Sequence, residues 1–294
     1  MRGGLLHHLR MALPGRARRL WARRLSAIVT TYNRSGVLRL CIASLEKQTR
    51  PPDEVVIADD GSDPGHVPAI EEIMAHSPLK IVHARQEHTG HRVSANRNNA
   101  VRHASGDLLF FTDGDVVLFP DVLEQHILAS GWRHWVSGYG VRLTPEETLR
   151  VTEEVIRSGK LEDLWPGWRD PRCVDLCRRG QKFRRNARKA RWRRTEHRLR
   201  RLLLIGMQAS VPREALERVN GFDETFEGWG DEDIDLGLRL QLAGVCGRSV
   251  LDTSRVLHLY HDPPPLAQPN RDHYRRPRSG QWVCENGLRK RCAP

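Results

Sequence analysis

The first residues whose types and spacing could do chemistry are Asp113 and Asp115. They flank Gly114 directly after the apolar run 108–111. Aspartate and glycine are ordinary turn residues, so a tight reversal of the chain is one interpretation. Two carboxylates this close repel each other unless a cation lies between them, and Mg²⁺ or Mn²⁺ with a diphosphate is a common solution in oxygen-ligand sites. The triplet alone leaves both interpretations open.

A second acidic cluster lies in the sequence EGWGDEDIDLGLRL, where Trp229 stands between two glycines. Carboxylates in the first turn of a helix interact favourably with its macrodipole, and one or two acids would satisfy that role. Here four acids follow the tryptophan, which indicates a general base beside an aromatic platform for a sugar or another ring. The four acids are Asp231, Glu232, Asp233 and Asp235.

Two histidines, His258 and His261, follow an apolar run in the sequence SRVLHLYHD. A histidine in such a place is more often a structural group than a ligand. Imidazole is nevertheless a common ligand of Mn²⁺-class ions when carboxylates supply the other ligands. The spacing does not decide between the two histidines.

The elements that must position these residues follow an alternating pattern. Short β-branched or apolar runs predict strands, and apolar residues at helical spacing predict the helices between them, the first with Ser35 as N-cap. This rhythm predicts an α/β fold, with a mostly parallel central sheet and helices on both faces. The predicted strands are 26–33, 54–62 with its end breaking into an acidic turn, 79–84 and 107–112. The predicted helices are one that runs from Ser35 through Leu45 and is stopped by Pro51 and Pro52, 67–75 and 94–103.

This architecture also predicts where a ligand binds. In open α/β sheets, ligands bind at the carboxyl ends of the strands. Residues 32–34, 59–63 and 113–115 all fall at such ends. We therefore expect three polar clusters to line one edge of the sheet.

Composition sets wider limits on the protein. The chain has 294 residues, of which 39% are hydrophobic, so it can bury a core as one large domain or two small ones. Its net charge of +12 favours an anionic partner, such as nucleic acid, phospholipid head groups, an acidic glycan or a phosphorylated small molecule. The six cysteines are expected to be reduced thiols, because no partner completes a zinc site around Cys173 and Cys177.

Three segments depart from the alternating pattern. Residues 1–25 form a basic arm that contains Trp21, and 178–201 form a basic insert that predicts an inserted helix or a mobile loop. Residues 263–294 are too rich in proline and charge to predict a packed element. No apolar run is long enough for a bilayer or a signal peptide, which predicts a cytoplasmic protein. The arm is a candidate for peripheral contact with the inner membrane surface, against the alternative of a disordered leader.

Taken together, the motifs resemble the family 2 glycosyltransferases of GT-A fold. VTTYNR, ADDGS, SANRNNAVRHASGD and FFTDGDVV match the nucleotide-sugar half of that family in order, over 26–120. The later VNGFDETFEGWGDEDIDLGLRL and SRVLHLYH, within 202–262, look like a galactosyltransferase-type C-terminal module with the acceptor and the catalytic base. Each motif is weak alone, but six in the right order are a specific signal.

The resemblance implies roles for single residues. Asp233 is the first choice for the base in the WGxED motif, with Glu232 beside it; Asp231 stands where glycine is frequent, which leaves the base open. Trp229 would stack on a sugar. The residues implied for the nucleotide sugar are Thr31, Tyr32, Arg34, Asp59, Asp60, Arg97 and Asp113. Those implied for Mn²⁺ or Mg²⁺ are Asp113 and Asp115 with His258 or His261.

The function implied is inverting transfer of a hexose, of galactose or N-acetylhexosamine type, from a UDP-sugar to a hydroxyl of a glycan or lipid-linked acceptor in polysaccharide or glycoconjugate biosynthesis. A nucleotidyltransferase and a non-catalytic GT-A domain are the alternatives, and the GWGDED motif argues against both. The basic insert, 178–201, would be either a solvated loop or a docking segment for an anionic lipid surface or an acidic acceptor. Nucleic acid is disfavoured, because no known RNA or DNA module surrounds the insert.

Overall fold

The computed structural model describes residues 23–131, 134–262 and 266–290. The predicted N-terminal arm therefore lies almost wholly outside the described residues. In the described part of the chain, no helix is both long and apolar enough to cross a membrane.

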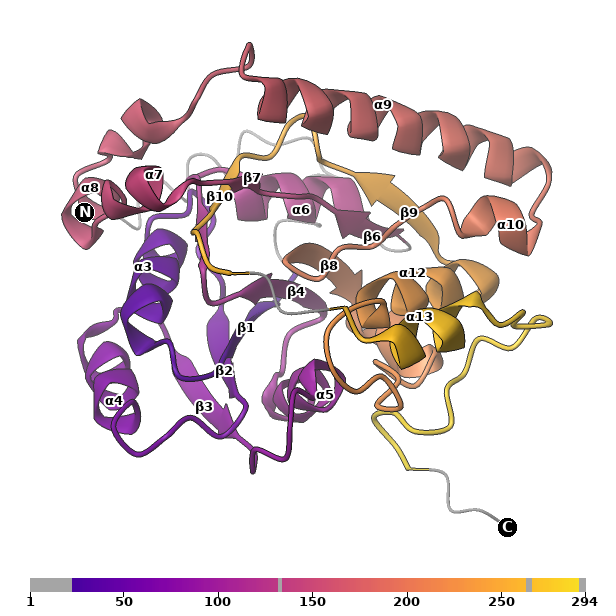
Figure 1. The fold of residues 1–294 in the computed structure, drawn as a ribbon, viewed down its shortest axis with the longest axis horizontal. Helices are drawn as coiled ribbons and strands as arrows, with labels where there is room; N and C mark the ends of the chain where they lie inside the picture. Colours follow the sequence, from indigo (N-terminus) through magenta and orange to yellow (C-terminus); the bar gives the residue numbers. More distant parts are fainter. Residues whose placement is uncertain (1–22, 132–133, 263–265, 291–294) are drawn as a thin grey trace.

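A seven-stranded sheet forms the centre of the molecule, in the order β3-β2-β1-β4-β8-β6-β9 (Figure 1). β1 pairs parallel with β2 and β4, and β2 pairs parallel with β3, whereas β8 runs antiparallel to β4 and β6. The prediction of a mostly parallel sheet is confirmed. The strands are β1 Leu25–Thr31, β2 Glu54–Asp59, β3 Ile81–Arg85, β4 Leu108–Asp113, β6 His134–Ser137, β8 Gln208–Pro212 and β9 Cys246–Ser249.

A small second sheet lies beside the end of β4. β10 is its central strand, antiparallel to β5 and parallel to β7. Its strands are β5 Val116–Leu118, β7 Val141–Arg142 and β10 Val256–His258. This sheet brings the end of the apolar run 256–259 next to the residues that follow β4.

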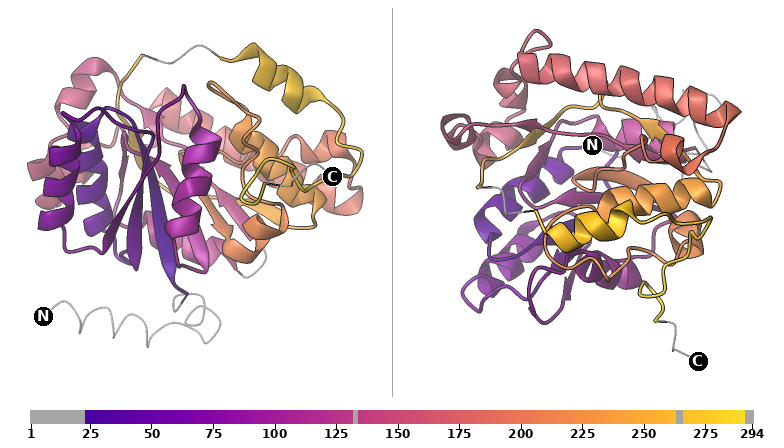
Figure 2. Two further views of the ribbon diagram at one scale, coloured as in Figure 1. Left: turned by 90° about the horizontal axis from the view of Figure 1, so that it is seen from below. Right: turned by 45° about the vertical axis from the view of Figure 1, so that its right-hand side comes forward.

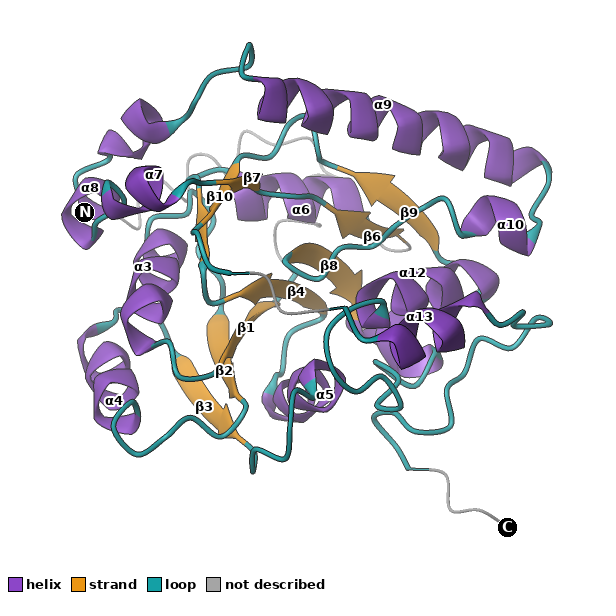
Figure 3. Cartoon of the chain, in the orientation of Figure 1, coloured by secondary structure: helices purple, strands orange, loops and turns teal. Residues whose placement is uncertain are grey.

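Helices cover both faces of the large sheet, as predicted (Figure 3). Side chains of one strand alternate between two apolar clusters, so Val29 packs on the side of α3 and Ile28 on the side of α5. The first helices are α3 Ser35–Glu46, α4 Val67–His76, α5 Val93–His103, α6 Val122–Ser130, α7 Pro145–Leu149 and α8 Glu153–Arg157. The others are a short 3-10 helix Lys160–Leu164, α9 Pro171–Trp192, α10 Glu196–Leu199, α11 Arg213–Arg218, α12 Glu232–Leu242 and α13 Gln268–Arg275.

The predicted N-cap of α3 is wrong. Arg34 occupies the N-cap position and makes no side-chain capping bond, and Ser35 is the first residue of the helix. The Ser35 hydroxyl lies 3.0 Å from Nδ1 of His66, just before α4. The Ser35 hydroxyl thus contacts His66 and does not cap the helix, contrary to the prediction from the sequence pattern.

The basic insert is helical in its first part and begins earlier than predicted. The 22-residue α9 starts at Pro171, where the Asp170 carboxylate accepts a bond from the Arg172 N–H at 2.8 Å. Proline at the first helical position and a capping aspartate are a strong start signal. The sequence predicted either an inserted helix or a mobile loop for this insert, and the structure shows a helix.

The expectation that 263–294 holds no packed element is wrong for residues 266–290. α13 packs against α12, and the chain beyond it returns to cover the loop before α12 (Figure 2). Tyr274 and Cys284 are 8% and 4% exposed. The composition of this segment did not predict its packing, because only single side chains are buried, separated by prolines and charged residues, and they form no periodic apolar face.

Candidate active site

A cavity of about 720 Å³ lies at the carboxyl ends of β1 and β4. The predicted edge of polar clusters is therefore present in the fold. Asp59 is the exception among the predicted residues, because it is fully buried and accepts bonds from the N–H and hydroxyl of Ser62. The predicted residues that line the cavity are Thr31, Tyr32, Arg34, Asp60, Arg97, Asp113, Asp115, Trp229, Asp231, Glu232, Asp233, His258 and His261.

Asp115 meets both histidines at one end of this cavity. The antiparallel pairing of β10 with β5 sets His258 opposite Val116, beside Asp115. The Asp115 carboxylate lies 3.7 Å from Nε2 of His258 and 3.4 Å from Nε2 of His261. Their ligand atoms all lie within 4.8 Å of one another. The sequence left the choice between the histidines open, and the structure brings both to the same carboxylate.

The electrostatics of this cluster suit a cation. Burial and the nearby Asp113 carboxylate raise the pKa of Asp115 to about 6. Burial lowers the pKa of His258 to about 4, against the attraction of Asp113, so its imidazole is neutral at pH 7. Oδ1 of Asp115 is buried and has no hydrogen-bond donor among the described residues. One carboxylate with an orphaned oxygen and two imidazoles fits a Mn²⁺-class ion.

Asp113 lies outside this group of three. Its carboxylate accepts a bond from the Thr30 hydroxyl at 2.9 Å and from Nη2 of Arg97 at 3.1 Å. Arg34 ion-pairs with Asp115 at 3.0 Å. Among the described residues the two aspartates therefore contact different partners: Asp115 contacts the histidines, and Asp113 contacts Thr30 and Arg97.

Arg97 links the two acidic regions across the cavity. This guanidinium is buried and ion-pairs with Asp113 and, at 2.9 Å, with Glu232 at the start of α12. Gly206 lets the guanidinium approach, because a Cβ there would lie 2.6 Å from it. The N–H of Gly206 in turn donates to the Asp233 carboxylate at 2.7 Å.

Three of the four acids in the motif GWGDEDID, the candidates for the base, have different environments. Asp231 ion-pairs with Arg271 at 2.8 Å, and Glu232 ion-pairs with Arg97. No ion pair joins Asp233 to a described cation, and its carboxylate accepts bonds from the backbone N–H groups of Gly206 and Ile234. Burial and the nearby Glu232 raise the pKa of Asp233 to about 7. Of the three, Asp233 is thus best prepared to take a proton at neutral pH.

Trp229 projects into the cavity from a loop that α13 holds. The indole is 38% exposed, and Gly228 and Gly230 beside it have φ of +79° and +105°. A side chain at Gly230 would also meet Leu266, whose Cδ1 would lie 2.5 Å from a Cβ there. Nδ2 of Asn270 donates to the Gly230 carbonyl at 3.0 Å. Asn270 was not predicted as a site residue, because it lies in the segment that we expected to be unpacked.

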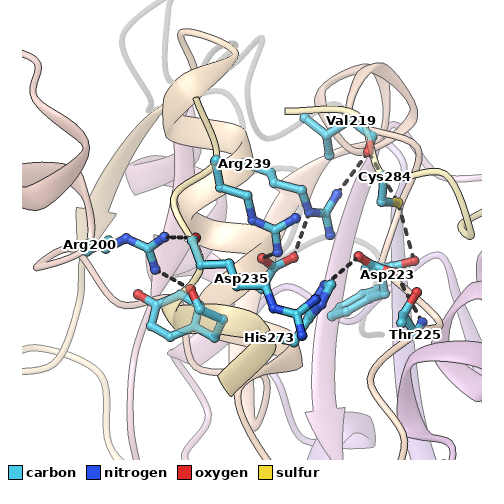
Figure 4. A network of polar contacts seen from close by, with 12 residues as sticks. Arg200, Val219, Asp223, Thr225, Asp235, Arg239, His273 and Cys284 are labelled. Atoms are coloured by element: carbon cyan, nitrogen blue, oxygen red, sulfur yellow. Dashed lines mark hydrogen bonds and ion pairs between the residues drawn. The ribbon is translucent and has the colours of Figure 1, made fainter. Parts of the chain in front are cut away.

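A buried ion pair supports α12 from behind (Figure 4). Asp235 and Arg239 are fully buried, and their side chains meet at 2.7 Å. Arg278, from the chain beyond α13, also ion-pairs with Asp235. The Arg239 guanidinium donates to the carbonyls of Val219 and Gly221, each at 2.8 Å. The C-terminal segment and the loop before α12 therefore fix the helix that carries Asp233.

An aromatic pair also lines the cavity, among the residues predicted to bind the nucleobase and ribose. Tyr32 stacks on His88 with a centroid distance of 4.1 Å and an interplanar angle of 10°. Nδ1 of His88 lies 3.1 Å from the Asp60 carboxylate. His88 also lines the cavity and was missed, because a single histidine after β3 carries no motif.

Two family models match the chain. Residues 26–178 match "Glycosyl transferase family 2", and 190–262 match "N-terminal domain of galactosyltransferase". Validoxylamine A glucosyltransferase of Streptomyces hygroscopicus subsp. limoneus is 30% identical over 232 residues, 75% of this chain and 48% of that protein. Chondroitin synthase of Pasteurella multocida (strain Pm70) is 28% identical over 82% of this chain and 25% of its own length. The chain thus spans half or less of these relatives.

Solved structures share the fold. A mannosyltransferase from Pyrobaculum calidifontis, in complex with GDP-Man and Mn²⁺, matches 89% of this chain and 66% of its own with a TM-score of 0.54 and 20% identity. TarS of S. aureus, in complex with UDP-GlcNAc, matches 82% of this chain and 59% of its own with a TM-score of 0.51 and 18% identity. Both are GT-A glycosyltransferases. The fold and the family model over 26–178 lead to one conclusion: this chain belongs to family 2 of the glycosyltransferases.

Proposed function

We propose that this enzyme moves a hexose from a UDP-sugar to a hydroxyl of a glycan or lipid-linked acceptor, with inversion at the anomeric carbon, in polysaccharide or glycoconjugate biosynthesis. The proposal rests on one observation: a metal-ligand cluster and a candidate general base line the same cavity. The cluster of Asp115, His258 and His261 fits a divalent cation, and Asp233, whose hydrogen-bond donors among the described residues are backbone N–H groups, suits a general base.

The donor is assigned to the half of the cavity made by residues 26–120. Tyr32 and His88 offer a stacked aromatic surface for the nucleobase, and Asp60 accepts from a ribose hydroxyl. The complexes with GDP-Man and UDP-GlcNAc in the two structural neighbours support a nucleotide sugar as donor. We assign UDP as the carrier because the second half, 202–262, matches the galactosyltransferase model.

A divalent cation, Mn²⁺ or Mg²⁺, would be held by Asp115, His258 and His261. When bound, it offsets the negative charge that develops on the leaving diphosphate. Arg34 lies 3.0 Å from Asp115 and is exposed enough to turn toward a phosphate. Arg97 stays buried on Asp113 and Glu232, so its role is to hold these two carboxylates in place.

The acceptor hydroxyl gives its proton to Asp233. The acceptor oxygen attacks the anomeric carbon from the face opposite the leaving nucleoside diphosphate, so the C–O bond to the diphosphate breaks as the new glycosidic bond forms. Trp229 stacks on a sugar ring and fixes its orientation. No carboxylate forms a covalent bond with the sugar.

The test is a donor screen with matched variants. The purified enzyme is incubated with UDP, GDP and dTDP sugars and Mn²⁺, and nucleotide release is measured with and without EDTA. We expect release from a UDP-hexose that EDTA stops. Release with GDP-sugars alone would refute the UDP assignment, and failure with every donor would favour a non-catalytic domain.

Two variants test the roles of single carboxylates. Asp233→Asn should stop transfer while UDP binding, measured by titration calorimetry, persists, and Asp115→Asn should abolish metal-dependent transfer. Asp231→Asn is the matched control, because that acid is already paired with Arg271. Wild-type turnover in Asp233→Asn, together with lost turnover in Asp231→Asn, would show that Asp231 is the base.

A further inference from the structure

The outer face of α9 carries a row of basic side chains that we call the basic stripe. Its members, Arg178, Lys182, Arg185 and Lys189, are exposed and follow one another at intervals of four, three and four residues. This spacing places them on one face of the helix. The buried side of α9 is made by Cys173, Leu176, Gly180, Phe183, Asn186 and Ala190. α9 runs along the outside of the molecule (Figure 1), and the stripe residues are exposed on a side of the helix away from its buried residues.

The charges of the basic stripe are not compensated by the rest of the described chain. No acidic group or hydrogen-bond acceptor in residues 23–131, 134–262 and 266–290 meets any of its four side chains. Other arginines of the same helix do have partners: Arg184 ion-pairs with Asp252, and Arg179 with Asp175. Like charges this close along a helix repel each other. An anion from outside the described chain would relieve that repulsion.

A hollow of about 470 Å³ lies beside the stripe. Three stripe residues line it, together with Asn186 and with Arg201, which follows α10. Asn186 is only 8% exposed, and its Nδ2 donates to the Arg201 carbonyl at 3.5 Å, so it ties α9 to the chain after α10 beside the hollow. Four cationic side chains around one hollow suit a phosphate group. The hollow has the size for the head group of a phospholipid.

Trp192 favours a lipid surface over a soluble polyanion. It lies three residues beyond Lys189, which extends the stripe, and it is 92% exposed. An indole beside basic side chains on the outside of a helix is typical of the interface between water and lipid. A single-stranded nucleic acid would instead need a series of stacking aromatics, and the stripe offers one.

We propose that the basic stripe and Trp192 dock this enzyme on an anionic phospholipid surface, with a head-group phosphate in the hollow beside α9. The helix also connects this surface to the active site. The Arg179 guanidinium lies 5.4 Å from the ring centre of Tyr139, and Tyr139 lines the active-site cavity. Docking through α9 therefore holds the cavity close to the bilayer, whichever donor the enzyme uses.

The experiment is flotation of the full chain with two kinds of vesicle. One contains neutral phosphatidylcholine alone, and the other also contains about 30 mol% of the anionic lipid phosphatidylglycerol. Each basic side chain at an anionic surface contributes about fivefold to partitioning. The reversal Arg185→Glu with Lys189→Glu should therefore lower partitioning onto anionic vesicles by about 25-fold or more. The interaction should weaken with added NaCl, and Trp192→Ala should lose the blue shift in fluorescence that vesicles cause.

Two control variants carry equal charge changes elsewhere. Arg218→Glu with Arg289→Glu alters exposed arginines outside α9, and Arg18→Glu with Arg19→Glu alters the N-terminal arm. Both should keep at least half of the wild-type partitioning. Equal recovery with neutral and anionic vesicles would overturn the proposal, as would loss of partitioning only in the arm variant. Tighter binding to a single-stranded oligonucleotide than to anionic vesicles would assign the stripe to nucleic acid instead.

Discussion

The raised pKa of Asp233 predicts that this residue costs the protein stability at neutral and alkaline pH. In the folded protein its pKa is about 7, against an ordinary value of 3.8. Between these two values the unfolded chain has already lost the proton that the folded protein still holds. Stability therefore falls as the pH rises from about 4 to about 7, and it changes little beyond that. Asp233→Asn removes the titration and with it this slope.

The size of the effect follows from the pH window. Each pH unit between the unfolded and folded pKa changes the free energy of unfolding by about 1.4 kcal/mol. Between pH 5 and pH 8 the protein crosses about two such units, so ionisation of Asp233 should cost about 2 to 3 kcal/mol. Asparagine keeps one acceptor oxygen for the Gly206 N–H and cannot also accept from Ile234. That loss is independent of pH, so the slope, not the absolute stability, carries the prediction.

The assay is urea unfolding of wild type and variant at pH 5 and pH 8, in metal-free buffer. The variant should gain about 2 to 3 kcal/mol relative to wild type on going from pH 5 to pH 8. Glu71→Gln, which changes an exposed acid on α4 with no partner among the described residues, should show no such gain. In the wild type, kcat/KM for transfer should rise with pH up to about 7. Parallel stability curves for wild type and Asp233→Asn would refute the environment that we assign to Asp233.

Three further changes test how the site is held. Arg239→Leu leaves Asp235 buried with half of its ionic partners and should cost about 3 to 5 kcal/mol of unfolding free energy in urea; a cost below about 1 kcal/mol would contradict the role of this pair. Asn270→Ala removes the bond to the Gly230 carbonyl, so it should destabilise by about 1 to 2 kcal/mol and slow transfer while UDP affinity stays the same. His261→Ala should weaken Mn²⁺ binding in calorimetry by about tenfold or more, and unchanged affinity would leave Asp115 and His258 as the site.

The sequence was sufficient for features that depend on local patterns. Alternating strands and helices predicted the parallel sheet, and the tendency of ligands to bind at the carboxyl ends of strands placed the residues around Tyr32 and Asp115 at one edge. The GWGDED motif predicted acids at the start of a helix, which is where α12 begins. These predictions succeeded because local patterns define each strand and helix, and the α/β topology then brings the carboxyl ends of the strands to one edge.

Long-range pairings were beyond the sequence. That His258 meets Asp115 follows from the register of β10 against β5, two strands about 140 residues apart, and His261 reaches the same carboxylate from the chain just after β10. The pairing of Arg97 with Glu232 joins α5 to α12 in the same way. A sequence does not show which charged residues, when about 30 or more positions apart, lie close together in space. It therefore gave candidate site residues but not the residues that they pair with.

The C-terminal segment shows how such pairings bear on function. Three residues of this segment contact the loop and helix that carry the acids. Asn270 donates to a backbone carbonyl of the loop, Arg271 ion-pairs with Asp231, and Arg278 ion-pairs with Asp235. From composition alone, Arg271 and Arg278 would be exposed surface cations. In the structure, each pairs with a carboxylate within a few residues of Asp233. With Asp231 and Glu232 both paired to arginines, Asp233 has no cation to itself, and burial can hold its pKa near 7. The environment of the proposed base, Asp233, thus depends as much on where the arginines are placed as on the acidic motif, and removal of residues 266–290 should make the environments of the three acids more alike.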